Sequence, residues 1–221
     1  MKFSGNGKQP LILVAALVVI ILGGGWSMWR TLRPEGAEGN QYPYRVLGAG
    51  VGEETVKLTR PSAPVVVIVA GGAGDPTAEK NAQLFSEALA KQGLKILATE
   101  TIPLPDIAMA GSPGKKIPGH HYTRLIDKHA GAAAVISLAG YPAFSETSPA
   151  PDEAPKVPFI AVVLGGLDPE REGAELQKLL KAGMVRLAVT RRGDSVPTSS
   201  KGSALRAEFD QHYQLLTAAG K

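Results

Sequence analysis

A glycine-rich turn with an adjacent carboxylate follows the most apolar run outside the N-terminus, in the stretch VVVIVAGGAGDP at residues 65–76. The residues of this turn that could contact a ligand are Gly71, Gly72, Gly74 and Asp75. Glycine leaves backbone N–H groups accessible, and the N-terminus of a following helix favours negative charge. The turn therefore predicts a binding site for a small anion.

The spacing of these glycines does not match a nucleotide-binding fingerprint. If Gly72 and Gly74 are the first two glycines of G-x-G-x-x-G, Thr77 stands at the third position, and no Gly-Lys-Ser/Thr follows. Asp75 also places a negative charge where a phosphate would lie. A tight turn, with Asp75 capping a helix that begins at Pro76, is the structural alternative to anion binding.

A basic segment between Lys178 and Arg206 is the second candidate for ligand contact, because its Lys and Arg residues are accompanied by one acid, Asp194. Arg191 and Arg192 follow the last predicted strand, on the side where the glycine turn also opens. A guanidinium matches the oxygens of a carboxylate or phosphate. Arg191 and Arg192 are therefore predicted to complete the anion site, and a solvated basic face is the alternative.

No pattern of catalytic or metal-binding residues accompanies these features. His120 and His121 are adjacent rather than one helical turn apart, so they point in different directions and do not predict a shared metal. Ser137 lies in VISLA, which lacks the G-x-S-x-G of a serine hydrolase, and it is predicted to be a core serine bonded to the backbone. The chain has no cysteine. We therefore predict no cofactor, metal or catalytic residue.

Apolar runs and turn residues predict the elements that must position the candidate residues. The runs at 65–69 and 158–164 show no polar alternation, which is typical of strands buried on both faces. The predicted strands are residues 65–69, 94–101, 133–139, 158–164 and 185–190. The predicted helices are residues 76–92, 120–130, 168–182 and 203–218. This order indicates an open, mostly parallel, doubly wound α/β sheet of about five strands in the order 2-1-3-4-5.

Two stretches are predicted to be irregular. Residues 31–63 are interpreted as a linker with two short strands, at 45–47 and 55–58. Residues 140–156 are rich in proline, serine and acid and predict a surface loop, either a tolerated insertion or a lid. The α/β domain is accordingly assigned to residues 64–221. The link between the third and fourth strands has no clear helix, unless residues 143–147 form a short helical turn.

An uncharged stretch of nineteen residues, 11–29, is long enough to cross a bilayer as a helix. No small-residue cleavage site follows it, so residues 1–30 predict an uncleaved membrane anchor, with a removed signal peptide as the alternative. A short N-terminus usually stays cytoplasmic, which places the remaining domain in the periplasm or outside the cell. Residues 34–221 carry equal numbers of basic and acidic residues, which argues against a nucleic-acid partner.

The predicted strand order is flavodoxin-like, and over residues 63–218 it also resembles one lobe of a type I periplasmic ligand-binding protein. The resemblance is one of topology, and it implies a ligand-binding role outside the cytoplasm. We therefore predict a single-pass, membrane-anchored, non-catalytic ligand-binding or envelope-assembly module. Its predicted partners are the bilayer, through residues 11–29, and a small anionic ligand or an envelope protein. The alternative is a membrane-anchored hydrolase or transferase with its site at the C-terminal ends of the strands.

Overall fold

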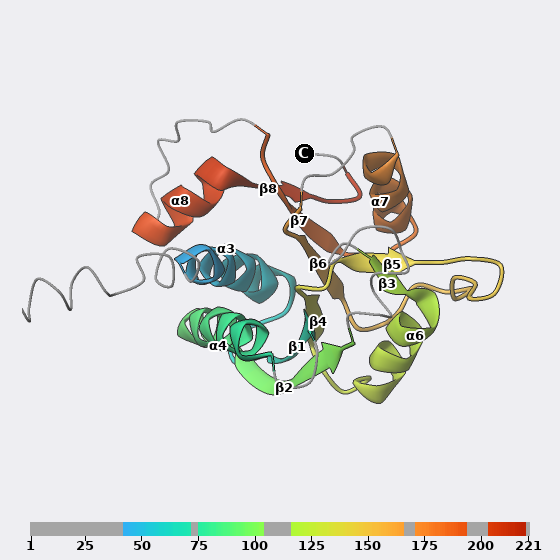
Figure 1. Cartoon of the computed structure of the whole chain (residues 1–221), viewed down its shortest axis with the longest axis horizontal. Coiled ribbons are helices and arrows are strands. Elements are labelled where there is room, and N and C mark those ends of the chain that lie inside the picture. The colour runs from blue at the N-terminus through green and yellow to red at the C-terminus, as the bar shows by residue number, and fades with distance from the viewer. Residues whose placement is uncertain (1–41, 72–74, 104–115, 166–170, 194–202, 220–221) are drawn as a thin grey trace, which may run out of the picture. The chain divides into compact units, whose positions relative to one another are not determined.

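The computed structural model describes residues 42–71, 75–103, 116–165, 171–193 and 203–219 (Figure 1). The helices are α3 (Tyr42–Leu58), α4 (Pro76–Lys91), α6 (Gly119–Lys128), α7 (Glu172–Lys181) and α8 (Ala204–His212). The strands are β1 (Pro64–Ala70), β2 (Lys95–Ile102), β3 (Lys116–Pro118), β4 (Ala134–Ser137), β5 (Tyr141–Ala143), β6 (Phe159–Val163), β7 (Leu187–Arg191) and β8 (Tyr213–Leu216).

The main sheet has the order β2-β1-β4-β6-β7-β8, and β3 pairs with β5 in a separate small sheet. The first five strands of the main sheet are parallel to their neighbours, and β8 is antiparallel to β7. The predicted order 2-1-3-4-5 is therefore confirmed. Every residue of β4 and β6 is buried, as is the interior of β1, because helices cover both faces of the sheet.

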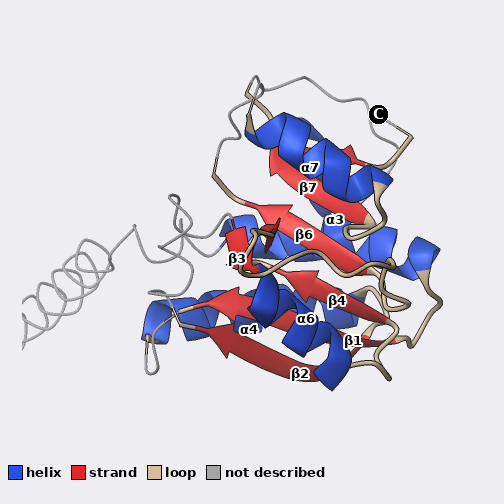
Figure 2. Cartoon of the chain, turned by 90° about the vertical axis from the view of Figure 1, so that its right-hand side faces the viewer, coloured by secondary structure: helices blue, strands red, loops and turns tan. Residues whose placement is uncertain are grey.

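Two hydrophobic layers lie on opposite faces of the sheet. Helices α3, α4 and α8 pack on one face, around Leu47, Phe85 and Phe209. Helices α6 and α7 cover the other face, around Tyr122 and Leu176. Figure 2 shows both layers against the strands, with β2 at one edge of the sheet. Side chains of β1 alternate between the two layers, so this strand joins both halves of the core.

The predicted strands at 45–47 and 55–58 are wrong, because residues 42–58 form the helix α3. Glycines suggested a linker, but here they permit close helix packing. A Cβ added at Gly48 would lie 2.6 Å from the Cβ of Ala88 on α4, and one added at Gly50 would lie 2.2 Å from the Phe209 ring. Tertiary contact therefore overrides the low helix propensity of glycine. Residues 41–221 form one compact unit, so the domain begins before residue 64.

The predicted closing helix at 203–218 is wrong in its second half. Helix α8 ends at His212, and Tyr213–Leu216 pair with β7 as strand β8. The predicted loop at 140–156 contains β5, which begins at the buried Tyr141, and it has no helical turn at 143–147. In both places hydrogen bonding to a neighbouring strand decides the conformation, which periodicity within one segment does not reveal.

The predicted membrane anchor and the first part of the linker, residues 1–41, lie outside the described residues. Among the helices that are described, none has the length and apolar character needed to cross a membrane.

Candidate ligand-binding site

The predicted glycine turn leads from β1 into α4, at the C-terminal edge of the sheet. The Gly71 N–H donates to the Ile102 carbonyl at 3.1 Å. The Asp75 carboxylate caps α4 by accepting from the N–H groups of Thr77, at 2.9 Å, and Ala78, at 3.1 Å. The helix start predicted from Asp75 and Pro76 is therefore confirmed. Gly72 and Gly74 lie outside the described residues.

A cavity of about 320 Å³ lies beside Asp75, at the edge where β1, β4 and β6 end. Its described lining is Tyr44, Val69, Ala70, Asp75, Thr77, Ala78, Asn81, Ala82, Leu138, Leu164 and Gly165. The connections from β1 and β4 run in opposite directions along the sheet, so this is the topological switch point. Open α/β sheets bind ligands at this place because the diverging connections leave a crevice.

The polar side of the cavity comes from α3 and α4. The side chains of Tyr44 and Asn81 are hydrogen-bonded to each other. Burial raises the pKa of Tyr44, and this hydrogen bond partly opposes the rise. Together with the Asp75 carboxylate and the Thr77 hydroxyl, these groups offer both donors and acceptors to a ligand. The rest of the described lining is apolar, so ligand orientation would depend on these four side chains.

The structure places Arg191 and Arg192 at the same edge of the sheet, but outside the described lining of this cavity. Strands β4 and β6 separate β1 from β7, a distance of about 14 Å at the usual strand spacing. Arg191 is exposed at the end of β7. Arg192 has a structural contact, since its Nε–H donates to the Tyr213 carbonyl at 2.9 Å.

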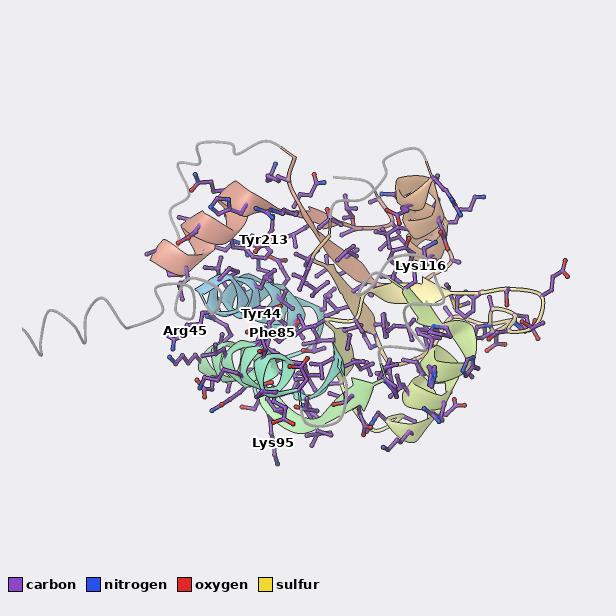
Figure 3. All side chains as sticks on the ribbon, viewed as in Figure 1. Tyr44, Arg45, Phe85, Lys95, Lys116 and Tyr213 are labelled. Carbon is purple, nitrogen blue, oxygen red and sulfur yellow. The ribbon has the colours of Figure 1, made fainter. Side chains whose placement is uncertain are left out.

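Tyr213 of β8 lies opposite Arg191 of β7 in the antiparallel pair. Burial raises the pKa of Tyr213; the positive charge of Arg191 opposes this rise, and Tyr44 adds to it. Both tyrosines pack against the same hydrophobic layer and are labelled in Figure 3. Arg191 is therefore close to Tyr213, which shares a hydrophobic layer with the cavity residue Tyr44.

The remaining sequence candidates have structural contacts. The Ser137 hydroxyl accepts from the Ala139 N–H at 3.1 Å, which confirms the prediction of a core serine bonded to backbone. His121 Nδ1 lies 2.8 Å from a guanidinium nitrogen of Arg124. Across the described ranges no group of three His, Asp or Glu side chains is arranged to hold a metal ion. Arg206, the last residue of the basic segment, is bound by three carboxylates of α3 and α8.

Sequence reasoning missed the lining residues Tyr44 and Asn81, and it missed the position of Tyr213 beside Arg191. Tyr44 lay in a segment interpreted as a linker, and Tyr213 in a segment interpreted as a helix. Asn81 lies on the predicted helix 76–92, one turn after its start. This position could have identified it as a residue that lines the site. A polar residue one turn from the cap lies above the end of the preceding strand.

Comparisons with known proteins give distant structural matches. No protein-family model matches the chain, and no curated protein is similar to it in sequence. An ABC-transporter solute-binding protein from Burkholderia graminis, in complex with D-arabinose, matches 81% of this chain at 14% identity with a TM-score of 0.45. An arabinose-binding protein from Geobacillus stearothermophilus matches 81% at 12% identity with a TM-score of 0.43.

The chain covers 60% and 61% of these two proteins, respectively. A sugar-binding protein of an ABC transporter from Bacillus halodurans matches 81% of the chain at 11% identity with a TM-score of 0.44. Similarity at this level concerns the arrangement of strands and helices and carries no functional information.

Proposed function

We propose that this protein is a non-catalytic module that binds a small polar ligand in the switch-point cavity. The observation that carries the proposal is the cavity of about 320 Å³, where Tyr44, Asp75 and Asn81 meet the apolar ends of β1, β4 and β6. An apolar pocket with a few convergent polar groups is the usual form of a small-molecule site. In the described lining the Asp75 carboxylate is engaged in capping α4, and burial raises the pKa of the Tyr44 hydroxyl, which favours binding over acid–base catalysis.

The expected charge of the ligand depends on which Lys or Arg side chains can contact it. The described lining contains the Asp75 carboxylate and no Lys or Arg, which favours a neutral, hydroxyl-bearing ligand in the cavity itself. An anionic ligand, the form predicted from Gly71, Gly72, Gly74, Asp75, Arg191 and Arg192, requires Arg191 to contact it. Arg191 is exposed at the same sheet edge and can serve this role without giving up a structural bond that the structure describes. Arg192 would have to release the Tyr213 carbonyl first.

Calorimetric titration of the full-length chain with D-arabinose and with inorganic phosphate separates these two ligand classes. Asn81→Leu should abolish binding of the neutral sugar, because it removes the amide beside Tyr44. Arg191→Ala should weaken phosphate binding by about tenfold or more and leave sugar binding unchanged, since a charged hydrogen bond contributes about 1.5–3 kcal/mol. Lys181→Ala, an exposed basic residue at the end of α7, is the matched control. If Asn81→Leu leaves the affinity for both probes unchanged, the proposed cavity is not the binding site.

The proposal also includes the location of the module. Residues 11–29 would hold the chain in the bilayer as a single pass, with the compact unit outside the cytoplasm. The full-length chain should then remain with membranes through high-salt and carbonate washing. Protease added to intact spheroplasts should degrade the domain. A soluble form that begins near residue 35–40 would instead show that the N-terminal segment is removed.

One described cluster supports the alternative of a hydrolase or transferase. Lys116 forms an ion pair with Glu175 at 2.6 Å, and its ammonium lies 5.7 Å from the centre of the Tyr141 ring. The Tyr141 hydroxyl is buried and has no hydrogen-bond partner among the described residues, while burial and the charge of Glu175 raise its pKa. A protonated phenol and a cation at the C-terminal edge could assist leaving-group departure. Hydrolysis of phosphate or acyl esters that Tyr141→Phe abolishes would favour the enzyme over the binding module.

A further inference from the structure

A second and larger hollow adjoins the switch-point cavity and lies between α4 and the edge strand β2. Its volume is about 770 Å³. The helix side of the hollow is formed by small residues at four-residue spacing, and these are Ala78, Ala82, Ser86 and Ala90. The strand side is formed by Ile96, Thr99 and Thr101. Large side chains of α4 point elsewhere, toward α3 and the core, so the outer face of β2 is left uncovered by this helix.

Strand β2 is also an open edge of the sheet, since β1 is its only neighbour in the described sheet. The register shifts between Val65↔Ile96 and Val66↔Ala98, which leaves Leu97 as an extra residue in β2. Leu97 is 50% exposed and is one of two large apolar side chains, with Leu58, that the described chain leaves exposed. An open edge beside an exposed leucine and an apolar hollow is a surface that proteins usually cover.

The residues of β2 are complementary to a second copy of β2 running antiparallel to it. When the two-fold axis passes between Leu97 and Ala98, Lys95 lies opposite Glu100 of the other copy, and Ile96 lies opposite Thr99. Ile96 packs toward the α4 layer, together with Thr99 in the hollow, whereas Glu100 contacts α6 through Lys128, so the paired residues share a face. Directly opposite positions of an antiparallel pair interact across the strands, and opposite charges there are favourable.

Helix α4 carries a charge pattern with the same symmetry. Its exposed residues beside the hollow are Glu79, Gln83 and Glu87, and Lys91 follows at the same four-residue spacing. When this stripe meets a second copy of itself antiparallel, Glu79 lies opposite Lys91 and Gln83 opposite Glu87. Each acid is thereby placed beside a cation or an amide. Small residues facing the hollow allow the two helices to approach closely.

The two symmetry centres lie at about the same level along β2 and α4. A Cβ at Gly71 would contact both Ala78, at 3.2 Å, and Thr101, at 3.8 Å, so these residues lie at the same level of the fold. From Thr101 to the midpoint between Leu97 and Ala98 is about 11 Å along β2, which corresponds to about seven residues of α4. The two-fold axis of the strand pair therefore lies level with residue 85 of α4, which is also the centre of the stripe from Glu79 to Lys91.

We propose that this surface is the interface of a two-fold symmetric homodimer, in which β2 pairs antiparallel with β2 of a second copy. The main sheet then continues across the axis, and the two copies of α4 lie antiparallel above it. Each Leu97 lies opposite Ala98 of the other copy, so the two Leu97 side chains are diagonal neighbours at the centre. The hollow shares Val69, Asp75, Ala78 and Ala82 with the switch-point cavity. The pairing residues of β2 and the stripe from Glu79 to Lys91 do not line that cavity, so the proposal does not depend on the ligand that the cavity binds.

Site-specific crosslinking tests the proposed register, because the chain contains no native cysteine. Leu97→Cys in the full-length chain, in detergent and in lipid vesicles, should form a covalent dimer on oxidation with copper phenanthroline. Leu58→Cys, the other exposed leucine, is the matched control and should remain monomeric on a non-reducing gel. Absence of a crosslink at residue 97, or equal crosslinking at residue 58, would overturn the proposal.

Charge reversal distinguishes this interface from association through another part of the chain. Glu79→Lys places two ammonium groups opposite each other, because position 79 faces Lys91 of the second copy, and it should raise the dimer dissociation constant by about tenfold. Adding Lys91→Glu restores the pairing and should return the constant to its original value. The measurement is analytical ultracentrifugation, with circular dichroism to verify the fold. A dissociation constant that the single reversal does not change, or that the double variant does not restore, rules out the interface, and so does a strictly monomeric chain.

Discussion

Arg206 of α8 should be a major contributor to the stability of this domain, because it ties α8 to α3. Its guanidinium donates to Glu53 at 3.1 Å, to Glu54 at 2.7 Å and to Asp210 at 3.0 Å. The side chain of Arg206 is 16% exposed and that of Glu54 is 15% exposed. Replacing Arg206 with Met keeps an apolar stem of similar length. It removes the charge, and with it the cation–π contact between the guanidinium and the Phe209 ring, whose centre lies 5.4 Å away.

The burial of this cluster sets the expected magnitude. Removing one partner of a fully buried ion pair costs about 3–5 kcal/mol, whereas an exposed pair contributes about 0–1 kcal/mol. Glu53 and Asp210 are 30% and 27% exposed, so water can solvate them once Arg206 is gone. Glu54 is less accessible to water and retains one cation, Lys57. We therefore expect Arg206→Met to lower the free energy of unfolding by about 2–3 kcal/mol.

The pH dependence provides a second readout from the same variant. Burial alone would raise the pKa of Glu54, but hydrogen bonds from Lys57 and Arg206 outweigh it and hold this pKa below its ordinary value of 4.5. A depressed carboxyl pKa stabilises the fold above the unfolded value, and this stabilisation is lost as the pH falls through the folded pKa. The stability difference between the wild type and Arg206→Met should accordingly be largest above about pH 5 and shrink below it.

Urea unfolding of the full-length chain in detergent, followed by circular dichroism between pH 3.5 and 7, measures both effects. Arg186→Met, which removes an exposed arginine in the segment before β7, should change stability by less than about 0.5 kcal/mol. A loss for Arg206→Met as small as for this control would refute the reasoning. A difference between Arg206→Met and wild type that stays constant down to pH 3.5 would show that Glu54 is not the group responsible.

Four further variants and one control test the packing of the core and of the small sheet. Gly50→Val places a side chain within 2.2 Å of a ring carbon of α8, so this variant should fail to form a native state that melts cooperatively. A Cβ at Gly131 meets nothing within 4 Å, so the control Gly131→Ala should fold like the wild type in the same melts. Val67→Asp and Val162→Asp each bury an unpaired charge in a strand that is covered on both faces, so either variant should yield insoluble protein. A soluble product that melts cooperatively would contradict the assignment of β1 and β6 as central strands. Tyr141→Phe removes a buried hydroxyl without a described partner and should leave the urea midpoint unchanged or raise it; a clear decrease would mean that the hydroxyl has a hydrogen-bond partner.

The parallel sheet was predictable because its strands are buried on both faces. Burial on both faces requires uninterrupted apolar runs, and the runs that contain Val67 and Val162 have no polar residue. The turn into α4 was predictable for a local reason, since Asp75 and Pro76 satisfy a helix N-terminus by themselves. Information of this kind is contained within a few consecutive residues, so one sequence is sufficient to read it.

Helix α3 and strand β8 could not be predicted in the same way, because their conformation depends on distant partners. Gly48 and Gly50 weaken a helix in isolation and become favourable only against Ala88 and Phe209, which lie far along the chain. Tyr213–Leu216 carry on the helical spacing of α8, but pairing with β7 gives them an extended conformation. The same dependence explains why Tyr44 was missed as a lining residue of the switch-point cavity.

The sequence of α4 makes sense once each of its faces is assigned to a different neighbour. Leu84, Phe85 and Leu89 are its large side chains, and they fix the helix on the sheet beside α3. The first turn, with Asp75 at its cap and Asn81 one turn later, closes the switch-point cavity. Large residues on the face toward β2 would have filled the outer hollow and completed the monomer. Small residues occupy that face instead, under a charge stripe that is symmetric about residue 85, and this combination favours a second copy of the same helix as the missing neighbour.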